Sequence, residues 1–358
     1  MIIHSMELLN FRNYERELFH FDPETNVLFG DNAQGKTNVL EGIYLCSTTR
    51  SHKGSKDREM IRLGMDESHL RMVVYKEGID HKIDVHLKKN KSKGIAVDGI
   101  PVKRSGELLG ICNIVFFSPE DLAIIQNGPD ARRRFIDMEL CQLDKMYLFY
   151  LTKYKHVLRQ RNELLKQISI NSELVDTLDI WNSKLIEYGT YVINARKDFV
   201  EKLNGYIKDI HKSLTGDKEE IDLIYEPDVR AEDFSEKLIL SEQKDLFTKT
   251  TNTGPHRDDL SFISEQKDLR KYGSRGQQRT GALSLKLTEI KIVEEKTGEK
   301  PILLLDDVLS ELDRNRQNYL LEHIKGIQTI ITCTGLEEFV KNGINIQKTF
   351  EIESGTVK

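Results

Sequence analysis

The 358-residue sequence has few cysteines and no long apolar run. The cysteines form no C-x-x-C pair, which favours reduced thiols in a cytoplasmic protein over disulfides or zinc ligands. They are Cys46, Cys112, Cys141 and Cys333. No apolar stretch approaches membrane-spanning length, and the N-terminus lacks a basic region followed by an apolar core. We therefore expect no signal peptide, no transmembrane helix and no membrane association.

The chain also lacks an excess of basic residues, internal repeats and low-complexity tracts. Its 53 Lys and Arg are outnumbered by 58 Asp and Glu, for a formal net charge of −5. This balance argues against a globally basic DNA-coating protein, but leaves room for a basic patch on one face. With 38% hydrophobic and 31% charged residues, a chain of this length can hold two domains, or one domain with a large insertion.

The most informative stretch is residues 30–37, which fits the G-x-x-x-x-G-K-[ST] pattern of a loop that holds nucleotide phosphates. Its members are Gly30, Asp31, Asn32, Ala33, Gln34, Gly35, Lys36 and Thr37. An apolar strand at residues 26–29 precedes it and a predicted helix at residues 37–46 follows it. This strand–loop–helix context favours a phosphate loop over a chance glycine-rich turn. The glycines allow backbone N–H groups to point at phosphate oxygens. Lys36 would reach the β- and γ-phosphates of ATP, and Thr37 would bind Mg²⁺.

Around this loop the sequence predicts a mixed α/β fold with an antiparallel β subdomain. Alternating segments at residues 70–75 and 82–87 indicate antiparallel strands. Asp98-Gly99 lies between two apolar runs and predicts a hairpin. Pro119, followed by two acids, predicts the start of a helical region that continues to about residue 240.

Two long amphipathic helices are expected within this helical region. Apolar residues recur at three- and four-residue spacing over residues 150–168 and again over 181–214. Such helices would pack antiparallel, either as a short coiled-coil-like hairpin or as an ordinary helical lobe. We place the boundaries at 1–118 for the first part of the α/β domain, 119–245 for the inserted lobe and 246–358 for the second part.

A second group of motifs follows in the last third of the chain. The apolar strand at residues 301–305 ends in Asp306 and Asp307. Beside the loop strand, Asp306 would reach the magnesium ion and Asp307 would lie next to an attacking water. Lys36 and Asp307 are therefore the candidate catalytic residues, and Thr37 and Asp306 the candidate metal ligands.

Residues 273–277 (G-S-R-G-Q) and 310–313 (S-E-L-D) complete the set. Together with the phosphate loop and the acidic strand, they resemble the signature motif and D-loop of the ABC-type ATPases. In that superfamily the signature closes on ATP held by a second subunit, so the resemblance implies an ATP-dependent homodimer. Ser274, Gly276 and Gln277 would then contact nucleotide, because hydroxyl and N–H donors at a helix start suit a phosphate.

Further motifs are similar to those of the RecF family of bacterial DNA replication and repair proteins, whose fold resembles the heads of SMC-type proteins. They are FRNY, GDNAQGKTN, RSH, FSPEDL, RRRFID, TGPHRDDL, SRGQQRT and LLLDDVLSELD. The resemblance implies ATP-dependent binding of single- and double-stranded DNA at gaps or junctions, with slow, DNA-stimulated ATP hydrolysis. It also implies action with RecR and RecO in recombinase loading and the SOS response. Arg12 would reach the nucleotide, as its counterpart does in SMC-type heads.

Three positions depart from the superfamily pattern. Asp307 stands where many relatives have glutamate, which favours slow turnover. The segment at residues 329–334 has no switch histidine, so Thr332 or Thr334 would sense the γ-phosphate. Ser118-Pro119-Glu120 replaces the glutamine that relatives place after the preceding strand.

Three basic clusters are candidate contacts for the DNA backbone. They are the loop of Lys88, Lys89, Lys91 and Lys93, the run of Arg50, His52, Lys53, Lys56 and Arg58, and Arg132, Arg133 and Arg134. For the lysine loop, a solvated surface that does not contact DNA is an equal alternative. For the three arginines, a structural role is favoured. The alternatives for the whole chain are the nucleotide-binding subunit of an ABC transporter, another SMC-like head and a kinase. The wide separation of the phosphate loop and the signature motif, together with the inserted helices, disfavours the transporter subunit. The signature motif disfavours the kinase.

Overall fold

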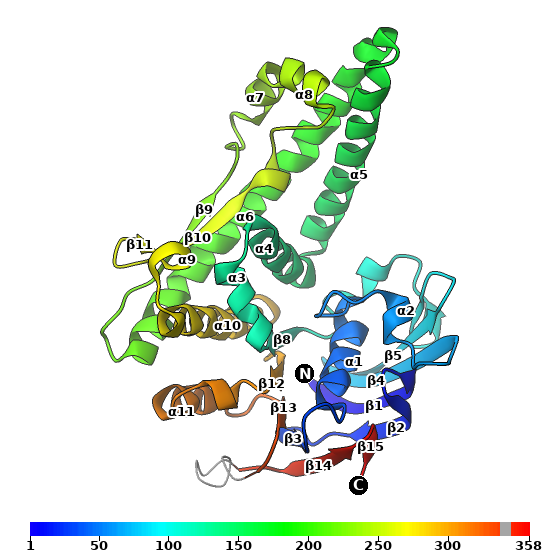
Figure 1. The fold of residues 1–358 in the computed structure, drawn as a ribbon, viewed down its shortest axis with the longest axis vertical. Helices are drawn as coiled ribbons and strands as arrows, with labels where there is room; N and C mark the ends of the chain where they lie inside the picture. The colour runs from blue at the N-terminus through cyan, green and yellow to red at the C-terminus, as the bar shows by residue number, and fades with distance from the viewer. Residues whose placement is uncertain (337–344) are drawn as a thin grey trace. The chain divides into compact units, whose positions relative to one another are not determined.

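The computed structural model describes residues 1–336 and 345–358, which form two compact units (Figure 1). The first unit comprises Met1–Asp121 and Glu289–Lys358, and the second comprises Leu122–Thr288. The expected first boundary, at 118/119, lies close to this division. The expected second boundary, at 245/246, does not, because residues 246–288 belong to the helical unit.

A largely parallel sheet organises the first unit. Its strand order is β15-β14-β3-β13-β12-β8, in which only β15 is antiparallel to its neighbour. The strands are β3 (Thr25–Phe29), β8 (Ile114–Phe117), β12 (Ile302–Asp306), β13 (Thr329–Cys333), β14 (Lys348–Glu353) and β15 (Thr356–Val357). Four of them read as short, nearly continuous apolar runs, as expected for strands of a parallel sheet covered on both faces. The strand that ends in Asp306 was expected beside the phosphate-loop strand, and this was wrong: β13 lies between β3 and β12 and pairs in parallel with both.

An antiparallel sheet of order β2-β1-β4-β5-β6-β7 forms the predicted β subdomain. Its strands are β1 (Ile2–Phe11), β2 (Tyr14–His20), β4 (Glu67–Lys76), β5 (Ile79–Lys88), β6 (Gly94–Val97) and β7 (Ile100–Pro101). Asp98 and Gly99, with φ of +54° and +79°, make the predicted hairpin turn between β6 and β7.

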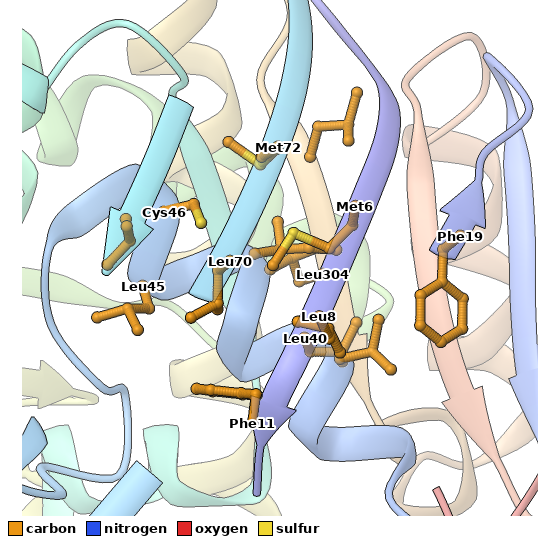
Figure 2. Packing of buried hydrophobic residues seen from close by; sticks show 14 of the residues in the cluster. Met6, Leu8, Phe11, Phe19, Leu40, Leu45, Cys46, Leu70, Met72 and Leu304 are labelled. Atoms are coloured by element: carbon orange, nitrogen blue, oxygen red, sulfur yellow. The ribbon is translucent and has the colours of Figure 1, made fainter. Parts of the chain in front are cut away.

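The helix α1 (Lys36–Thr48) joins the two sheets into one hydrophobic core. Figure 2 shows Leu40 and Cys46 of this helix among Met6, Leu70 and Leu304, which come from both sheets. This packing holds the helix that follows the phosphate loop. Further helices in the described part of this unit are α2 (Asp57–Met60), η1 (Ser105–Leu108), η2 (Pro119–Asp121), η5 (Leu309–Glu311) and α11 (Arg314–His323).

Helices α5 (Lys145–Ile168) and α6 (Leu178–Thr215) dominate the second unit and confirm the predicted helical pair. They are joined through η3 (Ser172–Thr177) and lie side by side (Figure 1). The shorter helices are α3 (Leu122–Gln126), α4 (Pro129–Leu143), α7 (Phe234–Leu240), α8 (Glu242–Thr248), η4 (Pro255–Arg257) and α9 (Leu269–Tyr272). Helix α10 (Arg275–Thr297) begins in this unit and ends at Gly298, whose φ of +71° suits the predicted helix end.

A small sheet in the second unit explains why the second boundary prediction was wrong. Strand β9 (Asp222–Glu226) lies in the stretch expected to be helical, and it pairs antiparallel with β10 (Asp259–Ser264). Strand β11 (Lys267–Asp268) completes the sheet. The pairing of β9 with β10 keeps residues beyond 245 packed in the helical unit. Within the described part of the chain, no helix is both long and apolar enough to cross a bilayer.

Candidate nucleotide site

The phosphate loop connects β3 to α1, as the sequence predicts. Gly30 and Gly35 have φ of +146° and +118°, a backbone conformation that other residues rarely adopt. A Cβ atom on Gly30 would collide with the carbonyl oxygen of Ile352, and one on Gly35 would lie 2.6 Å from the side chain of Asn13. Both glycines are therefore required by the backbone and by the lack of space.

The segment after β1 braces this loop, a role that the sequence did not indicate. The Asn13 side chain donates a 2.8 Å hydrogen bond to the carbonyl oxygen of Gln34, and the Tyr14 hydroxyl donates one of 3.1 Å to that of Gly35. From the other side, the N–H of Gly355 donates to the same Gln34 carbonyl at 3.0 Å. Asn13 and Tyr14 belong to the FRNY motif, which was the available signal.

Lys36 lies folded back over the loop. Its ammonium donates to the carbonyl oxygens of Gly30 at 2.5 Å and Asp31 at 2.8 Å. An ammonium has three N–H donors, so one remains for a phosphate oxygen. Burial lowers the pKa of Lys36, and the nearby charge of Asp307 partly opposes this effect.

Thr37 and Asp306 meet at the ends of their elements, as predicted. The Thr37 hydroxyl donates to Oδ1 of Asp306 at 2.7 Å, and the Thr332 hydroxyl donates to the same oxygen at 2.8 Å. The described residues contain no group of three or more His, Cys, Asp or Glu side chains that could hold a metal. A hydroxyl and one carboxylate suit Mg²⁺, which takes few protein ligands and binds substrate phosphates as well.

Thr332 was one of two candidates for sensing the γ-phosphate, and the structure gives it a different contact. Its side chain is buried, its hydroxyl orients Asp306, and it accepts the N–H of Asp307 at 3.0 Å. Thr334 is exposed beyond the end of β13. Of the two, Thr334 is the one left for the sensing role.

Asp307 adopts a φ of +52°, which is unusual for a residue other than glycine. This turn directs its side chain out of the sheet, where it is exposed. The Ser310 hydroxyl donates to the Asp307 carbonyl at 2.8 Å and to its carboxylate at 3.2 Å. The D-loop serine thus holds the proposed water-orienting carboxylate.

Arg12 is bound by acidic and polar groups of its own unit. Its guanidinium donates to both carboxylate oxygens of Glu41, at 2.7 and 2.8 Å, and also to Ser55. Burial raises the pKa of Glu41, but hydrogen bonds from Arg12 and Ser51 outweigh it and hold the pKa below its ordinary value. The expected contact of Arg12 with nucleotide stays a prediction.

The signature residues cap helix α10. The hydroxyl of Ser274 accepts the N–H of Gln277 at 3.2 Å, and the Gln277 side chain accepts the N–H of Ser274 at 2.9 Å. This reciprocal pair is a capping box. Gly276 leaves open space around the helix start, since a Cβ there would meet only the Ser274 hydroxyl, at 3.8 Å. Ser274, Gly276 and Gln277 belong to the second unit and the phosphate loop to the first.

Acids neutralise five residues of two of the predicted basic clusters, the lysine loop and the three arginines, whereas no salt bridge is formed by Arg50, Lys53, Lys56 or Arg58 among the described residues. Lys88 pairs with Glu67, Lys89 with Asp66 and Lys93 with Asp57. Arg132 is buried and forms a bidentate pair with Asp259, at 2.6 and 2.9 Å. Arg133 contacts Asp130 and the carbonyl of Asp258. In the run of residues 50–58, the ring nitrogens of His52 are buried and the backbone N–H of Lys56 is capped by Glu59.

Known proteins match this chain over almost its whole length. The chain matches the family described as RecF/RecN/SMC N terminal domain over residues 2–358. It is 59% identical over 358 residues to a protein of Lachnoclostridium phytofermentans named DNA replication and repair protein RecF, covering 100% of this chain and 99% of that one. The chain belongs to the RecF family. A RecF of Clostridium perfringens is 45% identical over 363 residues, with complete coverage of both chains.

Solved structures extend the comparison to the fold. A RecF structure described as the recombination mediator protein RecF-ATP in the RecFOR pathway superposes with a TM-score of 0.94 at 37% identity, covering 100% of this chain and 97% of that one. An SMC head bound to the C-winged helix domain of ScpA gives a TM-score of 0.60 at 16% identity, covering 100% and 96%. The second likeness shows the fold alone. The predicted fold class, an ABC-type ATPase head with an inserted helical lobe, is thereby confirmed.

Proposed function

We propose that this RecF-type ATPase is a switch in which bound ATP controls engagement with DNA. The observation that carries the proposal is the hydrogen bond between Thr37 and Asp306 at the edge of the phosphate loop. These two oxygen groups would hold Mg²⁺ against the phosphates of ATP, and Lys36 would bind the γ-phosphate. When bound, magnesium would neutralise charge at the phosphates, and Asp307 would orient the attacking water.

The active form would be a homodimer that encloses two ATP molecules. Ser274, Gly276 and Gln277 of one subunit would close on nucleotide held by the phosphate loop of the other. The donors at the capped start of α10 suit this contact. Because Asp307 is one methylene shorter than glutamate, we expect slow hydrolysis. The resemblance to the RecF family adds the expectation that DNA stimulates it.

The partners proposed for this chain are DNA, a second copy of itself, RecR and RecO. The solved relative belongs, by its description, to the RecFOR pathway, which supports a role with RecR and RecO. The chain would bind single- and double-stranded DNA at gaps or junctions in the cytoplasm. There it would assist recombinase loading and the SOS response. The family match and 59% identity over the whole chain leave the transporter alternative without support.

A DNA-binding titration with and without ATP, repeated at several salt concentrations, tests this function. We expect binding that strengthens with ATP and weakens steeply with salt, because phosphate contacts release counterions. A chain that binds no DNA, or binds it equally with and without ATP, would contradict the switch.

A further inference from the structure

Helix α5 contains a long acid-free stretch. Between Lys145 and Asn162 the sequence has no Asp or Glu, although the chain as a whole carries more acids than bases. The same stretch contains Lys145, Lys153, Lys155, His156, Arg159 and Arg161. A basic run of this length on one helix is a local feature that the net charge of −5 conceals.

The helix period separates these residues into two faces. Arg161 is fully buried, where it pairs with Asp245 at 2.8 Å, and it therefore belongs to the packing of the helical unit. Lys145, Lys153, His156 and Arg159 are all exposed. Along a helix axis, Lys145 and Arg159 are separated by about 21 Å. The basic groups thus line one side of α5.

Most of these charges are free of acidic partners. Among residues 1–336 and 345–358, Lys145, Lys153 and Arg159 form no salt bridge. Lys155 is the exception and pairs with Asp137. The Lys153 ammonium lies 5.7 Å from the centre of the exposed Phe149 ring. In the lysine loop, Lys88, Lys89 and Lys93 have acidic partners, and only Lys91 forms no salt bridge among the described residues.

We propose that the exposed face of α5, defined by Lys145, Lys153, His156 and Arg159, binds the phosphate backbone of a DNA duplex. A duplex offers regularly spaced negative charge along its whole length, which suits cations spread along a straight helix and needs no pocket. The polar side chain of Gln160 is also exposed and can donate to phosphate oxygens. The inference rests on the proposed DNA-binding function and assigns it to a surface.

The test compares two double variants in the full-length chain. Lys153→Gln/Arg159→Gln removes two charges from this face, and Lys237→Gln/Lys244→Gln removes two exposed charges from helices α7 and α8 of the same unit. Glutamine is a good helix former, so both variants should fold, which a thermal melt checks. Binding of a fluorescent duplex is measured in the presence of ATP between 50 and 200 mM salt.

We expect the α5 variant to reduce the slope of log affinity against log salt by about two, and to weaken binding roughly tenfold or more at 0.1 M salt. The control variant should keep the wild-type slope. A wild-type chain that binds no duplex would overturn the proposed function itself. A wild-type chain that binds, with the α5 variant matching the control, would overturn only the assignment to this face. Polyglutamate serves as a second probe, which stands for an acidic protein. If the α5 variant loses binding to polyglutamate but keeps duplex binding, the assignment of DNA to this face is overturned in favour of an acidic protein partner.

Discussion

The hydroxyl of Thr37 donates a 2.7 Å hydrogen bond to Oδ1 of Asp306, although 269 residues separate the two in sequence. The contact exists because β3 and β12 both pair with β13 in parallel register, which brings the ends of these strands to one edge of the sheet.

If Thr37 and Asp306 hold Mg²⁺, Asp306→Asn should abolish the magnesium dependence of ATP binding. Nucleotide titrations with Mg²⁺ and with EDTA measure this. A variant that still responds fully to Mg²⁺ would place the metal elsewhere.

Removing the Lys36 ammonium should weaken ATP binding and ATP-dependent dimerisation together. A hydrogen bond to a charged group contributes about 1.5–3 kcal/mol, so Lys36→Ala should weaken ATP binding roughly tenfold to a hundredfold. Fluorescent-nucleotide titration and light scattering measure the two effects. Lys197→Ala, on the exposed surface of α6, is the control. An intact ATP-dependent dimer of Lys36→Ala would refute the shared nucleotide site.

Asp307→Asn should separate turnover from binding. The amide cannot accept a proton from water, so we expect phosphate release to fall by about a hundredfold or more. ATP affinity and dimerisation should be retained, because Lys36, Thr37 and Asp306 are unchanged. Single-turnover hydrolysis is the measurement, and an unaltered rate would remove Asp307 from its proposed role.

Two substitutions at Ser274 distinguish helix capping from subunit pairing. Ser274→Ala removes the hydroxyl that accepts from Gln277 and should lower the free energy of unfolding by about 1 kcal/mol. Ser274→Arg adds bulk and charge, and should in addition block ATP-dependent pairing while the monomer still binds nucleotide. Denaturant melts and light scattering with ATP follow the two effects. If Ser274→Arg pairs normally, the signature does not close on a second subunit.

Stability should fall as the pH drops below about 6.5 because of His256. Its Nε2 lies 3.0 Å from the Thr251 carbonyl oxygen and its Nδ1 lies 2.6 Å from the Tyr154 hydroxyl, which together suit the neutral ring with the proton on Nε2. Burial lowers the pKa of His256 below its usual 6.5. The unfolded chain therefore takes up a proton that the folded chain does not. The free energy of unfolding should decrease by up to about 1.4 kcal/mol for each pH unit between 6.5 and the lowered pKa.

Urea melts between pH 7.5 and 5.5 measure this slope, and His256→Gln is the comparison. A glutamine has no proton to gain in this range, so the variant should show a shallower slope. Equal slopes in the two proteins would assign the pH dependence to other groups. His52 is one such group, because burial also lowers its pKa.

Structural features that depend on contiguous residues were predictable. The phosphate loop, the acidic strand end, the Asp98-Gly99 hairpin and the two long helices each carry their own local signal, whether glycine spacing, a turn pair or an apolar period. Strand β9 was missed because five residues without clear alternation do not differ from a helical segment until they pair with β10.

Sequence motifs are enough to predict a phosphate loop, acids after a parallel strand and a signature at the start of a helix. Which side chains meet depends on the tertiary structure. Thr332 orients Asp306, Glu41 binds Arg12, and Asp259 neutralises Arg132. These partners are at least 26 residues apart, and their contacts depend on strand order and helix packing, which no local pattern encodes. The same packing buries Arg161 of α5 and leaves Lys153 and Arg159 in solvent.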